Sequence, residues 1–281
     1  MGKDSSIEWT DHTFNPWWGC SKVSPGCEHC YAETWAKRVG AKVWGTESDR
    51  RFFKDNHWAE PLKWNEDAKS LRQRPRVFCA SMADVFEDRA DLNPWREKLW
   101  YLIAETENLD WLLLTKRPQN IGKMVKWSNV WPKNVWLGTT VEDQVRAKER
   151  LPHLLKHNAA RRFLSCEPLI GSVDLRPWIG AKDLFSIDWV IAGGESGGHA
   201  RPMLPSWART LRDQCKDAKI PFHFKQWGHW APVKSPVDNQ SKVKKFWDDV
   251  TGADILMVPS GKKRAGRHLD GTTWDQLPSM A

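Results

Sequence analysis

Short apolar runs recur along the chain, and longer charged or amphipathic stretches separate them. Runs this short, rich in β-branched and aromatic residues, predict strands, and apolar residues at helical spacing in the stretches between them predict helices. The expected strands cover residues 13–17, 76–80, 111–115, 135–139, 162–165, 188–192 and 221–225. The expected helices cover residues 31–39, 94–106, 121–125 and 206–218, with one more beginning near Glu142.

This alternation predicts an α/β fold built from βα units around a parallel sheet. Right-handed crossovers would wrap the units into a partial or near-complete parallel (β/α) barrel, although a doubly wound open sheet gives a similar pattern. We expect the barrel domain to span residues 1–230. Residues 231–281 are polar and basic with few apolar periods, and we expect them to form a C-terminal extension. Residues 40–65 are predicted to form a long loop rich in charge and aromatics, of a length that is often functional or mobile.

Chemically able residues follow several of the predicted strands, where a parallel barrel places its site. Each has a structural alternative: a helix cap for Asp84, Thr139 and Thr140, a solvated strand end for Lys116, and a tight turn for the run GGESGG. Glycines in such a run permit close approach of a ligand, and a glutamate beside them accepts hydrogen bonds. The candidate ligand-binding residues are Asp84, Lys116, Thr139, Thr140, Glu167, Gly193, Gly194 and Glu195.

Three of the six cysteines, Cys20, Cys27 and Cys30, lie within eleven residues as C-x6-C-x2-C, directly after a predicted strand and before a helix. Three thiolates suit three corners of a 4Fe-4S cluster and would leave the fourth iron open, whereas clusters used only for electron transfer normally take four cysteines. The alternative is a zinc site completed by His29 or His12. Cys166 is expected to be a small buried side chain.

Composition adds two expectations. A net charge of +8 and a pI near 9.2 favour a polyanionic partner such as nucleic acid. No run of eighteen apolar residues is present, and the N-terminus does not resemble a signal peptide, so we expect a soluble, cytoplasmic protein without a membrane partner. In a reducing compartment the cysteines would remain thiols or bind metal.

The cysteine segment, with Tyr31 after its last cysteine, resembles the radical S-adenosylmethionine (AdoMet) superfamily. Six residues separate the first two cysteines, where that superfamily most often has three. Together with the runs LLTKRP, GGESG, ARPM and LDGTTWDQLP, the segment also resembles the phage Gp37/Gp68 family over nearly the whole chain. The resemblance implies a 4Fe-4S cluster whose open iron chelates AdoMet and cleaves it to a 5′-deoxyadenosyl radical. It also implies a companion protein of methyltransferase-like type.

We therefore expect a radical AdoMet enzyme that acts on a nucleic acid or nucleotide. The alternative is a noncatalytic nucleic-acid-binding protein stabilised by zinc or by a cluster. Arg201 is a candidate substrate anchor. The expected phosphate contacts lie in the extension, at Lys242, Lys244, Lys245, Lys262, Lys263 and Arg264.

Overall fold

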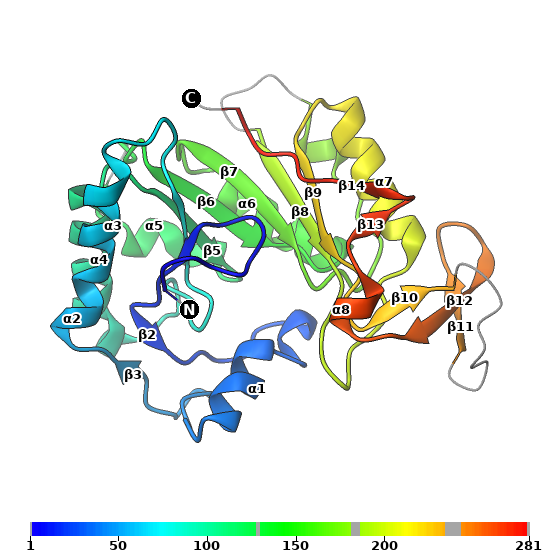
Figure 1. The fold of residues 1–281 in the computed structure, drawn as a ribbon, viewed down its shortest axis with the longest axis horizontal. Helices are drawn as coiled ribbons and strands as arrows, with labels where there is room; N and C mark the ends of the chain where they lie inside the picture. Colours follow the sequence, from blue (N-terminus) through cyan, green and yellow to red (C-terminus); the bar gives the residue numbers. More distant parts are fainter. Residues whose placement is uncertain (1, 128–129, 181–185, 234–242, 280–281) are drawn as a thin grey trace.

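The computed structural model describes residues 2–127, 130–180, 186–233 and 243–279. Its centre is a parallel sheet of seven strands in the order β1-β4-β5-β6-β7-β8-β9 (Figure 1). These strands are β1 (His12–Thr13), β4 (Arg76–Cys79), β5 (Asp110–Thr115), β6 (Val135–Thr140), β7 (Arg161–Cys166), β8 (Trp189–Gly193) and β9 (Phe222–Gln226). The predicted α/β class and partial parallel barrel are confirmed. Because β1 and β9 form the two edges and do not pair, the barrel is open.

The predicted helices are also present. Each begins and ends within about two residues of its expected bounds; for the helix near Glu142, only the start was predicted. They are α1 (Tyr31–Arg38), α4 (Asn93–Glu105), the short α5 (Ile121–Met124), α6 (Gln144–Leu154) and α7 (Pro205–Asp217). In Figure 1, α4 and α7 lie on the outer side of the sheet at its two ends. No described helix is long and apolar enough to cross a lipid bilayer.

The central strands are buried on both faces, which explains their nearly continuous apolar sequences. On β5, Trp111 and Leu113 pack into the large core beneath the helices, whereas Leu112 points to a second core on the concave side of the sheet. The N-terminal segment fills that concave side: Trp9 lies 4.7 Å from Phe78, centroid to centroid. The inside of the barrel is therefore closed at this level by aromatic packing.

Two expectations need correction. The first strand ends at Thr13, because Pro16 has no N–H to donate to a sheet; Trp17–Trp18 instead forms β2, which pairs antiparallel with β3 (Arg51–Phe52). Residues 40–65, expected to be a loop, contain β3, α2 (Asp55–Trp58) and the start of α3 (Glu60–Ala68). Trp58 and Trp64 from these helices are buried in the large core, which fixes the segment.

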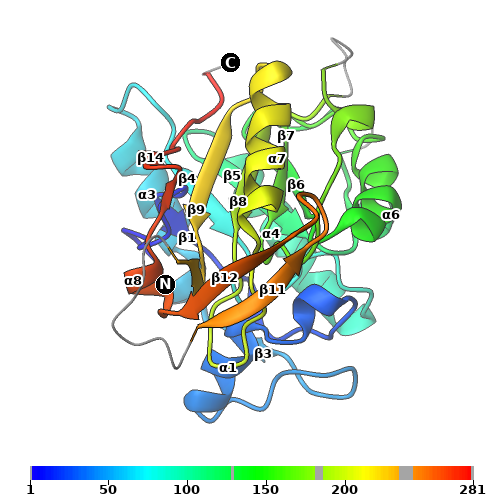
Figure 2. The same cartoon turned by 90° about the vertical axis from the view of Figure 1, so that its right-hand side faces the viewer.

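The described residues after 230 form further strands and a short helix, and part of them lies against the barrel. Strands β10 (Trp230–Pro232), β12 (Ala253–Pro259) and β11 (Lys244–Asp248) form an antiparallel sheet (Figure 2). The short α8 (Lys262–Ala265) and the hairpin of β13 (His268–Leu269) and β14 (Thr272–Thr273) follow it. Beyond the hairpin, backbone N–H groups and carbonyls bond along the open edge of β9, including Phe224 N to Trp274 O at 2.8 Å. The last turns of the chain thus cover an edge that would otherwise expose unpaired backbone groups.

Candidate functional site

The cysteine loop, residues 19–30, runs between β2 and α1 across the ends of the central strands. Gly19 opens it with φ +119°, and a Cβ at this position would lie 2.3 Å from the carbonyl oxygen of Val43, so only glycine fits. Its N–H donates to Met82 O at 3.0 Å, just beyond the end of β4. The loop is therefore attached to the barrel from its first residue.

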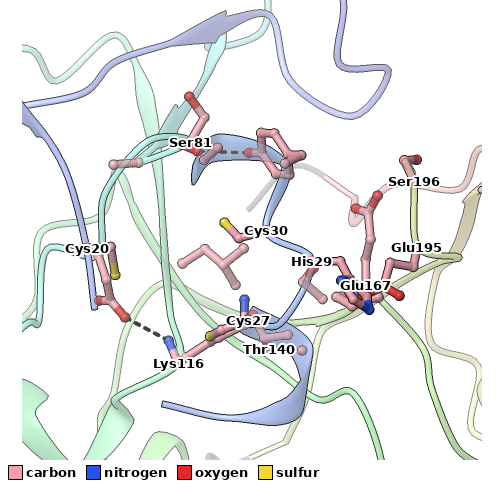
Figure 3. Close-up of a pocket in the computed structure, with 18 of the residues that line it drawn as sticks. Cys20, Cys27, His29, Cys30, Ser81, Lys116, Thr140, Glu167, Glu195 and Ser196 are labelled. Atoms are coloured by element: carbon pink, nitrogen blue, oxygen red, sulfur yellow. Dashed lines mark hydrogen bonds between the residues drawn. The ribbon is translucent and has the colours of Figure 1, made fainter. Parts of the chain in front are cut away.

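The thiols of Cys20, Cys27 and Cys30 are free and line one pocket of about 370 Å³. Figure 3 shows them around one end of this pocket, with Glu167, Glu195 and Ser196 at the other. The volume lies within the usual range of small-molecule sites. Cys79, Cys166 and Cys215 are buried elsewhere in the core and do not line the pocket, as expected for Cys166.

The donor set suits a cluster better than a single ion. Among the described residues, no group of three or more His, Cys, Asp or Glu side chains is placed to hold one metal ion. A lone zinc needs its ligands to converge on one point, whereas each thiolate of a cubane cluster binds its own iron. His12, one proposed zinc ligand, packs against Trp64 at 4.7 Å and does not line the pocket; His29 does line it. The three soft sulfurs on one pocket wall fit an iron-sulfur cluster.

Arg117 holds the first cysteine in place. Its guanidinium donates to Cys20 Sγ at 3.5 Å and to the carbonyl and hydroxyl oxygens of Ser21, both at 2.8 Å. Burial opposes the charged form of Arg117, but the neighbouring Asp84 and Cys20 outweigh it and raise its pKa. Burial raises the pKa of the free Cys20 thiol to about 12, and metal binding would be needed to deprotonate it.

Asp84 is the anchor of this arrangement. Its carboxylate accepts hydrogen bonds from Arg117 Nη1 at 2.9 Å, Thr115 Oγ1 at 2.7 Å, and the backbone N–H groups of Lys116 and Phe86 at 3.0 Å. It is buried and lines the pocket, but its acceptor sites are largely occupied by the protein. These contacts orient Arg117 and the end of β5.

A second support comes from Glu195 and Arg201. The buried Glu195 carboxylate accepts from Arg201 Nε at 3.0 Å and Nη2 at 2.6 Å. The same guanidinium donates to Pro25 O at 2.9 Å and Glu28 Oε2 at 3.2 Å. Arg201, expected to be a substrate anchor, therefore links the loop after β8 to the cysteine loop.

Glu142 provides a third support, which the sequence did not indicate beyond the start of a helix. Its carboxylate accepts from Gly26 N at 3.3 Å and from Arg150 Nη1 at 2.6 Å. A Cβ on Gly26 would lie 3.0 Å from that carboxylate. Burial opposes ionisation of Glu142, but Arg150 and other donors outweigh it and lower its pKa. A signal was present, since an acidic residue follows the strand end in VWLGTTVED.

The remaining candidates divide into two groups. Thr140, Gly194 and Glu167 line the pocket with Lys116, and Lys225 Nζ lies 2.8 Å from both oxygens of Glu167. No hydrogen bond or ion pair joins the Nζ of Lys116 to a described residue, although its charge helps to lower the pKa of the nearby Glu142. Thr139 and Gly193 do not line the pocket. Thr139 donates to Thr115 O at 2.8 Å within the sheet, and Gly193 lies under Glu167, where an added Cβ would be 3.3 Å from that side chain.

Gly194, directly after β8, allows close packing of backbone on backbone. A Cβ on Gly194 would lie 2.0 Å from Trp227 O, so the loop after β8 and the loop after β9 touch through their backbones. His229 N then donates to Glu195 O at 2.8 Å. The close approach expected of these glycines is made by the protein's own chain.

Comparison with known proteins gives one family. Among solved structures, a tyrosine-to-phenylalanine mutant of spore photoproduct lyase is similar with a TM-score of 0.49 and 12% identity, over 92% of this chain and 71% of that chain. Spore photoproduct lyase complexed with dinucleoside spore photoproduct gives a TM-score of 0.46 and 11% identity over the same shares. No curated protein matches this sequence. The family described as "Protein of unknown function (DUF5131)" matches residues 4–278. With this match over almost its whole length, the chain belongs to the DUF5131 family.

Proposed function

We propose that this protein is a radical AdoMet enzyme that holds one 4Fe-4S cluster on Cys20, Cys27 and Cys30 and acts on a nucleic acid or nucleotide. The observation that carries the proposal is the shared pocket. Three free thiols form one wall of a cavity at the carboxyl ends of a parallel barrel, and no fourth cysteine lines it. When bound, the cluster would offer an open iron to AdoMet and the electron that cleaves it to a 5′-deoxyadenosyl radical.

The protein's own residues supply binding and orientation. Lys116 lines the pocket and its charge acts on the nearby Glu142; an ammonium in this position can hold a ligand carboxylate by a charge-assisted hydrogen bond. Thr140 adds a hydroxyl to the pocket wall, suited to a ribose. Arg117 and Arg201 fix the cysteine loop from two sides.

Apolar residues form part of the pocket lining, which would limit the access of water to a bound ligand. Trp9, Phe78 and Leu114 from the concave core line it together with Ile7. Water exclusion matters here because a reactive intermediate survives only where side reactions are prevented. A pocket with an apolar floor and charged walls also suits a nucleoside, which has an aromatic base and a polar sugar.

AdoMet cleavage tests the proposal without knowledge of the substrate. Anaerobically reconstituted protein is reduced with dithionite and supplied with AdoMet, and chromatography measures 5′-deoxyadenosine. We expect slow formation by the parent chain and none by Cys27→Ala, the matched control without an intact cluster site. Protein with a full 4Fe-4S complement and measurable AdoMet binding that forms no 5′-deoxyadenosine would contradict the proposal. It would favour a cluster that only stabilises a nucleic-acid-binding protein.

A further inference from the structure

The short helix α8 carries three consecutive basic residues, and the first of them lies at the rim of the pocket. Lys262, Lys263 and Arg264 are exposed on consecutive positions, and Lys262 lines the same pocket as the three cysteines. None of the three forms an ion pair with a described acidic residue, whereas Lys225, which also lines the pocket, is paired with Glu167. The rim therefore carries positive charge without observed compensation.

This rim is fixed to the barrel. Ser260 N and Gly261 N both donate to His229 O at 2.9 Å, and His229 N donates to Glu195 O at 2.8 Å. At the other end of α8, Trp227 N donates to Gly266 O at 3.2 Å. Backbone hydrogen bonds thus connect both ends of α8 to the loop that follows β9, and that loop is bonded in turn to the loop that follows β8. A charge on α8 keeps a set position relative to the pocket.

The other basic positions of the extension are arranged differently. Lys245 forms an ion pair with Asp254 at 3.0 Å, and Lys244 lies 5.5 Å from the ring centre of Trp230. Both are on β11, in the small antiparallel sheet that precedes α8 in the chain (Figure 2). Neither lines the pocket. Lys242 lies outside the described residues. The six basic residues expected to contact phosphates are therefore not equivalent.

Lys116 gives the pocket a second ammonium, and Cys20 and Arg117 line the same pocket; the charge of Lys116 is partly offset by the buried Glu142. A ligand that contacts both Lys262 and Lys116 would meet an ammonium group at each place, and apolar residues line the same pocket. A nucleic acid strand has this pattern, because its phosphates repeat at each nucleotide and its bases are apolar on their faces. Enzymes that act on a base also need it out of the stack and inside a pocket.

We propose that α8 binds the phosphodiester backbone of a nucleic acid strand, at Lys262 and Lys263, while one nucleotide of that strand enters the pocket. This inference deepens the proposed function and rests on it for the substrate class. It assigns the binding of the nucleic acid backbone to α8. It gives no phosphate contact to Lys244 and Lys245 on β11. Each phosphate contact would release counterions and so contribute to the salt dependence of binding.

The test compares two double variants that each remove two charges. Lys262→Gln/Lys263→Gln changes α8, and Lys244→Gln/Lys245→Gln is the matched control on β11. Arg264 is left intact because its Nε donates to Ser260 O at 3.0 Å and helps to hold the turn. Binding of labelled single-stranded DNA, and of RNA of the same sequence, is measured by fluorescence anisotropy over a range of KCl concentrations. Cluster-loaded protein is used without AdoMet.

We expect the α8 variant to bind more weakly. The slope of the logarithm of the binding constant against the logarithm of the KCl concentration should become shallower by about 1.4, because each of the two lost contacts to a single strand contributes about 0.7. The β11 variant should keep the parent affinity and slope. A preference for DNA or for RNA identifies the source of the strand, and either supports the inference. Unchanged binding by the α8 variant, equal losses in both variants, or no binding by the parent chain would overturn it. Because AdoMet is absent, this result is independent of whether the protein cleaves AdoMet.

Discussion

The guanidinium of Arg201 joins the carboxylate of Glu195, 2.6 Å away, to the carbonyl oxygen of Pro25 in the cysteine loop, 2.9 Å away. Positions 195 and 25 are far apart in the sequence, yet one side chain connects the loop after β8 to the loop that carries the cysteines. This contact, with those of Arg117 and Glu142, holds the cysteine loop over the barrel from several strand ends.

Replacing Glu195 by Gln should loosen the cysteine loop. The variant loses charge-assisted hydrogen bonds to Arg201, each worth about 1.5 kcal/mol or more, so iron should leave a reconstituted cluster about tenfold faster. Iron release to a chelator under anaerobic conditions measures this. Glu149→Gln is the control, because it removes an exposed ion pair with Arg146 on α6. An unchanged release rate in the Glu195 variant would contradict the linking role of Arg201.

Alanine at Cys20, Cys27 or Cys30 should each remove the cluster. Alanine at Cys79, Cys166 or Cys215 should retain it, because these thiols are buried away from the pocket and lose only a small apolar contact. Iron and sulfide content after anaerobic reconstitution decides the question. A cluster that survives in the Cys27 variant would remove the basis of the assignment.

Lys116→Ala should weaken AdoMet binding and leave the iron content unchanged. Loss of one hydrogen bond to a charged group costs about 1.5 kcal/mol or more, which corresponds to roughly tenfold in affinity. Equilibrium dialysis with cluster-loaded protein provides the measurement. Lys123→Ala, an exposed position on α5, serves as the control. If both variants bind AdoMet as the parent does, Lys116 is a solvated strand-end residue.

Gly194→Ala should destabilise the fold by about 1–3 kcal/mol, as overpacking of backbone against backbone does. The added Cβ would lie 2.0 Å from Trp227 O and 2.7 Å from Trp227 C, so the two loops must separate. Gly198→Ala is a matched control in the same loop, since its added Cβ has no neighbour within 4 Å. Urea denaturation of both variants tests the difference. Equal stability of the two would show that the loops adjust freely.

Burial lowers the pKa of His223 to about 4, from an ordinary value of 6.5. The unfolded chain therefore takes up this proton first as the pH falls. Above pH 6.5 the imidazole is neutral in both states and does not reduce stability. Between pH 6.5 and 4 the free energy of unfolding falls, by at most about 1.4 kcal/mol per pH unit, because only the unfolded chain binds the proton. His223→Phe should flatten the dependence of unfolding free energy on pH in this window. The same slope in variant and parent would place the acid sensitivity elsewhere.

The sequence by itself determined the strand and helix pattern. Apolar runs of β-rich residues and helical periodicity are local properties, and they predicted the seven strands of the parallel sheet and the helices α1, α4, α5, α6 and α7, but not α2 and α3 in the expected loop of residues 40–65. The spacing of Cys20, Cys27 and Cys30 is equally local, and it indicated that the three thiols would lie together. The first strand is shorter than its pattern predicts, because Pro16 has no N–H to donate to a sheet.

Only the tertiary structure decided what each strand-end residue contacts. Asp84 accepts from Arg117, 33 positions away, because β4 and β5 are neighbours in the sheet. Gly26 N donates to Glu142 across 116 positions, and Lys262 reaches the pocket because α8 is bonded to the loop after β9. Sequence patterns record which residues are apolar or charged along one element. The partner of a buried charge depends on which elements meet in space, and the high energetic cost of leaving such a charge unpaired then selects the arrangement.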